Sequence, residues 1–197
     1  MIGLRTKVQG NNAYFRRFGR NKVSIIGRML RNTADHFGEE WIGKNESSLS
    51  CIESLVNQAS TTLYMVTGEL DPSLYERTSL PGQIESALQR GVKIKIVFHK
   101  NVGTVEQAKE AFKKTNPKMA ELATRYSNKI LFYWREKRPN GHYLVSDSDG
   151  IFLEEEHEAY GQRGAIAKSH TFNLGKKLYE RFENFIKTSD CHQLSFA

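Results

Sequence analysis

Cysteine is scarce in this chain of 197 residues: only Cys51 and Cys191 are present, and neither has a second cysteine at metal-ligand spacing. We therefore expect free thiols and a fold that needs no disulfide. No run approaches the roughly 18 to 20 apolar residues of a membrane helix, and residues 1–18 lack the compact apolar core of a secretory signal. These absences predict a cytoplasmic protein without a membrane span.

Acidic residues are absent from residues 1–31, which carry eight lysines and arginines in a chain of net charge +7. Aromatic rings alternate with these cations, as in proteins that bind single-stranded nucleic acid, where cations follow the phosphates and rings stack on bases. Contact with a partner chain would use the same residues. The candidate nucleic-acid-binding residues of this arm are Phe15, Arg16, Arg17, Phe18 and Arg20.

The chain divides, on this reading, into a basic N-terminal arm over residues 1–47 and an α/β domain over residues 48–197. The arm has neither a helical nor a strand period, which leaves a partly ordered extension or a dimer strap. In the domain, apolar periodicity predicts helices over residues 49–59, from about 81 to 90, and over 105–114, 117–126 and 173–187. Runs of β-branched and aromatic residues predict strands over residues 61–67, 92–98 and 129–134, and a hairpin of 142–146 with 151–154.

The strand, helix, strand succession between residues 61 and 98 predicts a β-α-β unit with parallel strands. His99 and Lys100 follow the second of these strands, at the edge where open parallel sheets usually bind ligands. We regard both as candidate phosphate-binding residues. A solvated strand end is the alternative.

The predicted hairpin begins with His142-Tyr-Leu-Val-Ser-Asp-Ser-Asp149. Its spacing resembles the H-x-K-x-x-x-x-D motif of the phospholipase D superfamily, and the order of elements over residues 48–187 resembles one repeat of that family. The resemblance implies a mixed, mostly parallel sheet flanked by helices. It also implies that His142 attacks phosphorus and that Asp149 supports the histidine or the turn. A plain structural role for His142 is the alternative.

The lysine of the motif is replaced by Leu144, which can neither bind phosphate nor neutralise a developing charge. Losing such a cation typically costs on the order of 10² to 10³ in rate. Lys168 would replace it if its side chain reached the same cleft. Ser169 and Asn173 match, at looser spacing, the family's Gly-Ser-x-Asn element, and the resemblance makes them candidate catalytic residues.

Acidic residues gather around His157 in the run Glu154-Glu-Glu-His-Glu158. A divalent ion could bind there, but contiguous like charges usually face water, so we expect a solvated loop and neither a metal nor another cofactor.

Three functions are compatible with this pattern. The first is a degenerate phospholipase-D-like domain that binds nucleic acid or another phosphate-bearing ligand with little or no turnover. The second is a homodimeric, metal-independent phosphodiesterase or nuclease in which His142 of each chain acts across a two-fold axis. The third is a regulatory or oligomerisation module.

Overall fold

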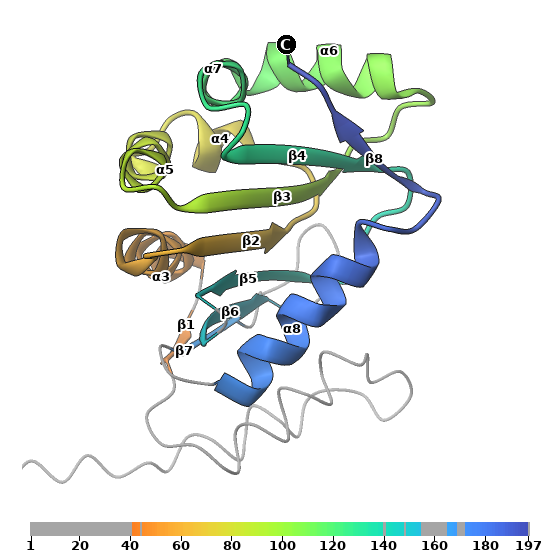
Figure 1. Ribbon diagram of the computed structural model, residues 1–197. Helices are drawn as coiled ribbons and strands as arrows, with labels where there is room; N and C mark the ends of the chain where they lie inside the picture. Colours follow the sequence, from red (N-terminus) through yellow and green to blue (C-terminus); the bar gives the residue numbers. More distant parts are fainter. Residues whose placement is uncertain are drawn as a thin grey trace, which may run out of the picture. The chain divides into compact units, whose positions relative to one another are not determined.

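One mixed β-sheet organises the domain in the computed structural model (Figure 1), which describes residues 41–43, 45–139, 141–147, 149–154, 165–168 and 172–196. Within these ranges the strand order is β1-β7-β6-β5-β2-β3-β4-β8. The candidate residues of the basic arm, Ser169 and residues 155–158 of the acidic run lie outside the described residues. The predicted boundary between residues 47 and 48 stays a prediction.

The strands are β1 (Trp41–Gly43), β2 (Thr62–Val66), β3 (Lys93–His99), β4 (Ile130–Arg135), β5 (His142–Ser146), β6 (Gly150–Glu154), β7 (Ala165–Lys168) and β8 (Cys191–Leu194). The described helices are α3 (Asn45–Gln58), α4 (Pro72–Tyr75), α5 (Leu80–Gln89), α6 (Val105–Thr115), α7 (Pro117–Arg125) and α8 (Phe172–Phe185). Every helix and strand predicted for residues 48–187 is present, with ends shifted by a few residues.

The predicted β-α-β unit is confirmed: β2 and β3 are parallel and α5 connects them. Pro81 lies in the first turn of α5. A backbone N–H at that position would have no acceptor within the helix, so proline removes no helical hydrogen bond. Gly91 follows the helix with a φ of 98°, a backbone conformation that favours glycine, and so turns the chain into β3. β4 extends the parallel part of the sheet beside β3.

The expectation of a mostly parallel sheet is wrong. Among the described strands, only β2 with β3 and β3 with β4 pair in parallel, whereas the other five neighbouring pairs are antiparallel. The predicted hairpin accounts for part of the difference. The rest comes from β1, β7 and β8, which are only three or four residues long and therefore leave no periodic signal in the sequence.

Helices cover both faces of the sheet (Figure 1). On one face, side chains of α3, α5, α6 and α7 pack with alternate residues of the central strands, including Leu63, Ile96 and Phe132, in the main hydrophobic core. On the other face α8 packs through Phe182, whose ring stacks on Tyr64 of β2. Successive residues of the central strands point to opposite faces of the sheet, and helices bury both faces. The central strands are therefore almost continuously apolar.

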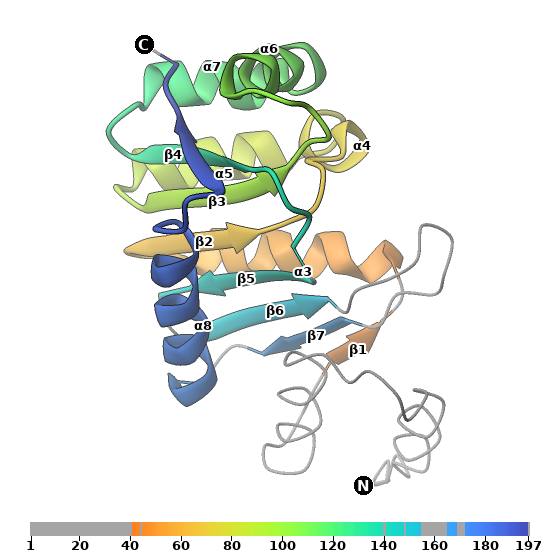
Figure 2. The same cartoon turned by 90° about the vertical axis from the view of Figure 1, so that its right-hand side faces the viewer.

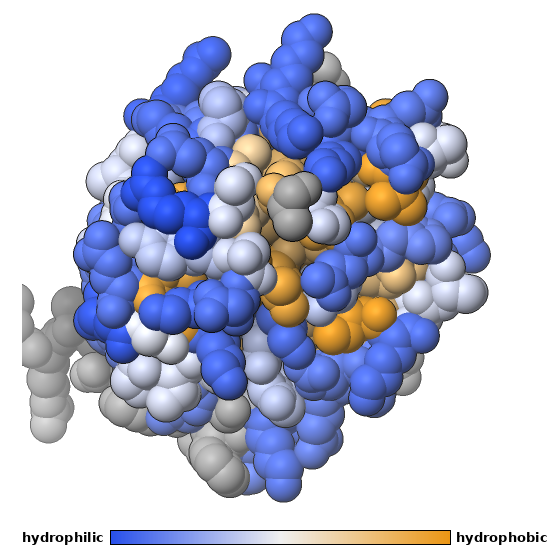
Figure 3. Space-filling view, turned by 45° about the horizontal axis from the view of Figure 1, so that its top comes forward, coloured by the Kyte–Doolittle hydropathy of each residue, from blue (hydrophilic) through white to orange (hydrophobic). Residues whose placement is uncertain are grey.

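The face seen in Figure 3 is largely hydrophilic, and its hydrophobic residues form small separate patches. Such scattered apolar residues are normal on a folded domain. None of the described helices is long and apolar enough to cross a membrane. Cys51 and Cys191 are free thiols, as expected.

Candidate functional site

A cavity of about 810 Å³ opens at the edge of the sheet where β2 and β3 end and β5 begins. Figure 2 shows α4 at this edge, beyond the end of β2. This is the carboxyl edge of the parallel strands, where α/β sheets usually bind ligands. The charged and polar residues lining the cavity include Glu69, Asp71, His99, Asn101, Arg138, His142 and Glu154.

His142 and Glu154 form a hydrogen-bonded pair in this cavity. They are cross-strand neighbours at the open end of the β5–β6 hairpin, and His142 Nδ1 lies 2.9 Å from Glu154 Oε2. The side chains are 18% and 9% exposed, respectively. Because a carboxylate only accepts hydrogen bonds, Nδ1 carries the proton, and a neutral ring then has its lone pair on Nε2. This tautomer suits a histidine that attacks an electrophile through Nε2, and Nε2 donates a hydrogen bond only when the ring is protonated on both nitrogens.

The acidic run was expected to be a solvated loop, and this is wrong for its first residue. Glu154 is the last residue of β6 and is only 7% exposed. A buried carboxylate requires a partner, which His142 supplies. The expectation failed because Glu154 is followed directly by further glutamates, so that in the sequence it resembles the start of a charged loop. In the structure it pairs across the strands with His142.

Arg138 approaches His142 next to Gly68, which follows β2. A Cβ atom built on Gly68 would lie 2.9 Å from His142 Nε2 and 4.0 Å from Arg138 Nε. Because both distances start from the same point, His142 Nε2 and Arg138 Nε are no farther apart than the two distances added together. A guanidinium beside an imidazole offers a phosphate several hydrogen-bond donors. Sequence reasoning missed Arg138 because it lies in the irregular segment between β4 and β5, where no periodicity shows the direction of the side chain.

Replacing Gly68 with alanine should displace His142, because the added Cβ would overlap its ring. The expected result is weakening of the bond between His142 and Glu154, seen as altered ¹⁵N shifts of the imidazole nitrogens. Gly82→Ala is the matched control: it lies in α5, and its Cβ would meet no atom within 4 Å. The control should leave the imidazole signals unchanged and raise stability by about 0.5 to 1 kcal/mol. Unchanged His142 signals in Gly68→Ala would contradict the geometry.

Leu144, which occupies the lysine position of the motif, also lines the cavity. It lies two residues after His142 on β5 and therefore projects from the same face of the sheet. It is 1% exposed and is flanked on the neighbouring strands by Met65 and Phe152. The position where the family has a cation is therefore apolar in this chain.

Asp147, two residues before the motif residue Asp149, makes extensive contacts at the turn of the hairpin. Its carboxylate accepts hydrogen bonds from the backbone N–H and hydroxyl groups of Ser60 and Thr61, and from Thr62 N, at 2.7 to 2.9 Å. Asp149 lies in the same turn, where its N–H donates to Ser146 O. Both aspartates are therefore at the opposite end of β5 from His142.

Lys168 pairs with Ile151 in the sheet, whereas Ala165 is the residue of β7 that pairs with Glu154. With about 3.3 Å per residue and 4.8 Å per strand, the Cα atom of Lys168 lies roughly 14 Å from that of His142. This register gives no support to the idea that Lys168 replaces the missing lysine. Asn173 is exposed at the start of α8, which packs on the other face of the sheet.

His99 is the second histidine that lines the cavity. Its Nδ1 lies 3.1 Å from the backbone oxygen of Arg135, and its backbone N–H donates to Gly68 O. Lys100 points to Glu69, with 3.1 Å between the ammonium and the carboxylate, so its charge is largely balanced there. The two residues thus reach the expected edge of the sheet, but only His99 borders the cavity.

Within the described ranges, no group of three or more histidine, cysteine, aspartate or glutamate side chains is placed to hold a metal ion. The cavity offers hydrogen-bond donors and acceptors of its own. Its strongest features are one arginine, the oriented His142 and the carboxylates of Glu69 and Asp71.

No protein-family model and no curated protein sequence matches the chain. Solved structures do resemble it. Nuc from Salmonella typhimurium, a phospholipase D family member, aligns with a TM-score of 0.56 and 14% identity over 80% of this chain and 98% of Nuc. Phosphatidylserine synthase from Haemophilus influenzae Rd KW20 aligns with a TM-score of 0.56 and 14% identity over 86% of this chain and 46% of the synthase.

TrmBL2, an archaeal chromatin protein whose structure shows a novel mode of DNA binding, aligns with a TM-score of 0.55 and 18% identity. The alignment covers 80% of this chain and 58% of TrmBL2, so the chain spans less than two thirds of that protein. These likenesses confirm the expected phospholipase-D-like fold. At such low identity they concern the fold alone.

Proposed function

We propose that this domain binds nucleic acid through the phosphate-binding corner formed by Arg138 and His142, with little or no turnover. The observation that carries the proposal is the composition of the cavity. Arg138 and His142 converge beside Gly68, while the third position that a phosphoryl-transfer site of this fold would use holds the buried Leu144.

Binding and catalysis place different demands on this corner. A phosphodiester in its ground state needs donors, which the guanidinium of Arg138 would provide, together with the Nε2–H of His142 when the ring carries a proton on both nitrogens. A transition state with additional negative charge needs a further preorganised cation close to the reacting oxygen atoms. An apolar side chain at residue 144 cannot meet that demand, so the corner favours retention of the ligand over its cleavage.

Nucleic acid is the phosphate-bearing ligand that we favour for two reasons. TrmBL2, which has a similar fold, is described as binding DNA. The sequence of this chain also begins with a strongly basic arm whose charges and rings suit single strands. The arm would add affinity that does not depend on base sequence, and the corner would hold one phosphate in a defined position.

A second candidate is favoured by the hydrogen bond between His142 and Glu154. An imidazole held by a carboxylate in this tautomer is also the arrangement of a nucleophile or general base. In that case the domain would be a metal-independent phosphodiesterase that brings together His142 of two chains. Cleavage of labelled DNA or RNA in EDTA, lost in His142→Ala, would establish this activity and overturn the proposal of a binder.

Arg138→Ala should weaken binding of labelled single-stranded DNA by about ten- to one hundredfold, since charge-assisted hydrogen bonds contribute about 1.5 to 3 kcal/mol. It should also reduce the slope of log K against log salt concentration by about one. Lys137→Ala is the matched control, because Lys137 is the preceding exposed cation and does not line the cavity. Fluorescence anisotropy at several salt concentrations measures both quantities.

The two parts of the proposal can fail separately. If Arg138→Ala and Lys137→Ala weaken binding equally, the cavity is not the binding site. If Arg16→Ala with Arg17→Ala leaves affinity and salt dependence unchanged, the arm makes no contribution. Binding without any salt dependence in the unaltered protein would contradict nucleic-acid recognition as a whole.

A further inference from the structure

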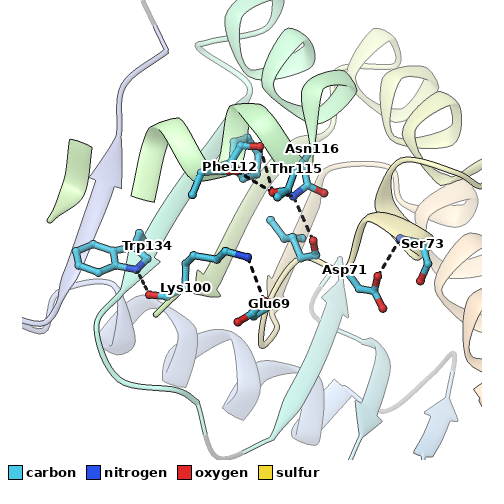
Figure 4. Close-up of polar contacts among 10 residues, drawn as sticks. Glu69, Asp71, Ser73, Lys100, Phe112, Thr115, Asn116 and Trp134 are labelled. Atoms are coloured by element: carbon cyan, nitrogen blue, oxygen red, sulfur yellow. Dashed lines mark hydrogen bonds and ion pairs between the residues drawn. The ribbon is translucent and has the colours of Figure 1, made fainter. Parts of the chain in front are cut away.

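A second wall of the cavity is acidic. Glu69 and Asp71 both line the cavity and both come from the segment between β2 and α4 (Figure 4). Arg138 and His142, in contrast, come from the segment before β5 and from its first residue. The cavity is thus bordered by an arginine and a histidine from one part of the chain and by carboxylates from another.

Each of these carboxylates keeps one oxygen without a hydrogen-bond donor from the described part of the chain. Asp71 Oδ1 accepts from Ser73 N at 2.9 Å, and this caps α4. Glu69 Oε2 lies 3.1 Å from Lys100 Nζ. The remaining oxygens, Asp71 Oδ2 and Glu69 Oε1, are acceptors that a ligand could use.

The acidic wall is held in place from behind. Leu70, between the two acids, has its backbone oxygen bound by Asn116 Nδ2 at 3.2 Å, and Asn116 is only 2% exposed. The backbone oxygen of Lys100 accepts from Trp134 Nε1 at 3.0 Å. Figure 4 shows Asn116 next to the segment that carries the acids and Trp134 next to Lys100, which pairs with Glu69. A backbone held in this way favours selective recognition, because less of the segment has to be ordered when a ligand binds.

We propose that the acidic wall recognises the base of a nucleotide whose phosphate is held by Arg138 and His142, and that it favours guanine. The inference rests on the proposed function and specifies its ligand. Glu69 is paired with Lys100 and offers only its Oε1 as an acceptor, whereas Asp71 forms no ion pair within the described residues. A phosphate is repelled by Asp71 and attracted by Arg138, so a nucleotide has one favourable orientation in the cavity. Its base then faces the carboxylates.

Guanine matches this wall because its N1–H and 2-amino groups are donors on one edge of the base. Carboxylate side chains, which only accept, suit such donors. Adenine and cytosine offer one amino group next to a ring acceptor. Uracil and thymine offer a single N–H between two carbonyl oxygens, which the carboxylates repel. The cavity volume of about 810 Å³ lies within the range of sites for small molecules.

Calorimetric titration with GMP, IMP and UMP tests the proposal. The unaltered protein should bind GMP about tenfold more tightly than UMP, since a good base contact discriminates by about 1 to 3 kcal/mol. IMP, which lacks the 2-amino group, should bind with intermediate affinity. Asp71→Asn and Glu69→Gln should each reduce the preference for GMP over UMP, and they should not weaken UMP binding.

The variants are chosen to preserve the fold. Asparagine caps a helix as well as aspartate does, so Asp71→Asn should retain α4. Glu110→Gln is the matched control, because Glu110 is an exposed acid of α6 that pairs with Lys113 and does not line the cavity. It should leave the preference unchanged. Melting temperatures within about a degree of that of the unaltered protein would show that all three variants are folded.

The outcomes separate this inference from the proposed function. Equal binding of GMP and UMP, or a preference for GMP that survives in both cavity variants, overturns the role of the acidic wall and leaves phosphate binding by Arg138 and His142 intact. No binding of any nucleotide or of labelled DNA overturns both. Loss of the preference in the two cavity variants alone supports the assignment.

Discussion

Asp147→Ala is expected to lower the free energy of unfolding at pH 7 by about 2 to 3 kcal/mol, because it leaves several donors without their charged acceptor. The carboxylate accepts five hydrogen bonds from residues 60–62, which lead into the central strand β2. Solvent reaches part of the group, so the effect is smaller than the sum of five buried bonds. The melting temperature should fall by about 5 to 10 °C.

The same contacts make the stability depend on pH. Partial burial of Asp147 disfavours its charge, but the hydrogen bonds from the backbone of Thr62, Ser60 and Thr61 outweigh burial and lower its pKa from 3.8 to about 2. A carboxyl whose pKa is lower in the folded state contributes stability above its unfolded pKa. That contribution is lost as pH falls from about 4 through about 2.

Asp147→Asn isolates this charge effect. Asp147 has a φ of 51°, a left-handed conformation that asparagine tolerates, so the substitution adds little backbone strain. Urea denaturation should show a stability difference between the unaltered protein and Asp147→Asn that is full at pH 7 and smaller at pH 3. A difference that is the same at both values would mean that the Asp147 carboxylate is not the responsible group.

Leu144→Lys is expected to raise phosphodiester cleavage in EDTA by about 10² or more over the unaltered protein. The substitution restores a cation on the face of β5 that carries His142, where it would stabilise charge that develops on a phosphate. The buried position between Met65 and Phe152 disfavours an ammonium group, so the variant should also be less stable, by several kcal/mol. Cleavage of labelled single-stranded DNA measures the gain.

Two further variants identify the source of any gained activity. Leu144→Met keeps an uncharged side chain of similar volume and should show no gain. Leu144→Lys combined with His142→Ala should lose the activity again, because it removes the side chain that we expect to attack phosphorus. A folded Leu144→Lys protein that binds DNA but cleaves no faster than Leu144→Met would show that the missing lysine is not what limits turnover.

Local patterns in the sequence predicted the main elements between residues 48 and 187, because core helices and strands bury alternate or every third to fourth residue. The resemblance of residues 142–149 to the H-x-K-x-x-x-x-D motif singled out His142. Local patterns did not show the short strands β1, β7 and β8, which have too few residues for a period. As a result the predicted balance of parallel and antiparallel pairs was wrong.

The sequence by itself determined the order of the longer helices and strands between residues 48 and 187 and the replacement of lysine by Leu144. Only the tertiary structure decided which residues meet His142. Glu154 reaches it through strand pairing, and Arg138 and Gly68 reach it from segments that follow different strands. Such contacts depend on register and on the course of irregular segments, and neither is encoded in local periodicity.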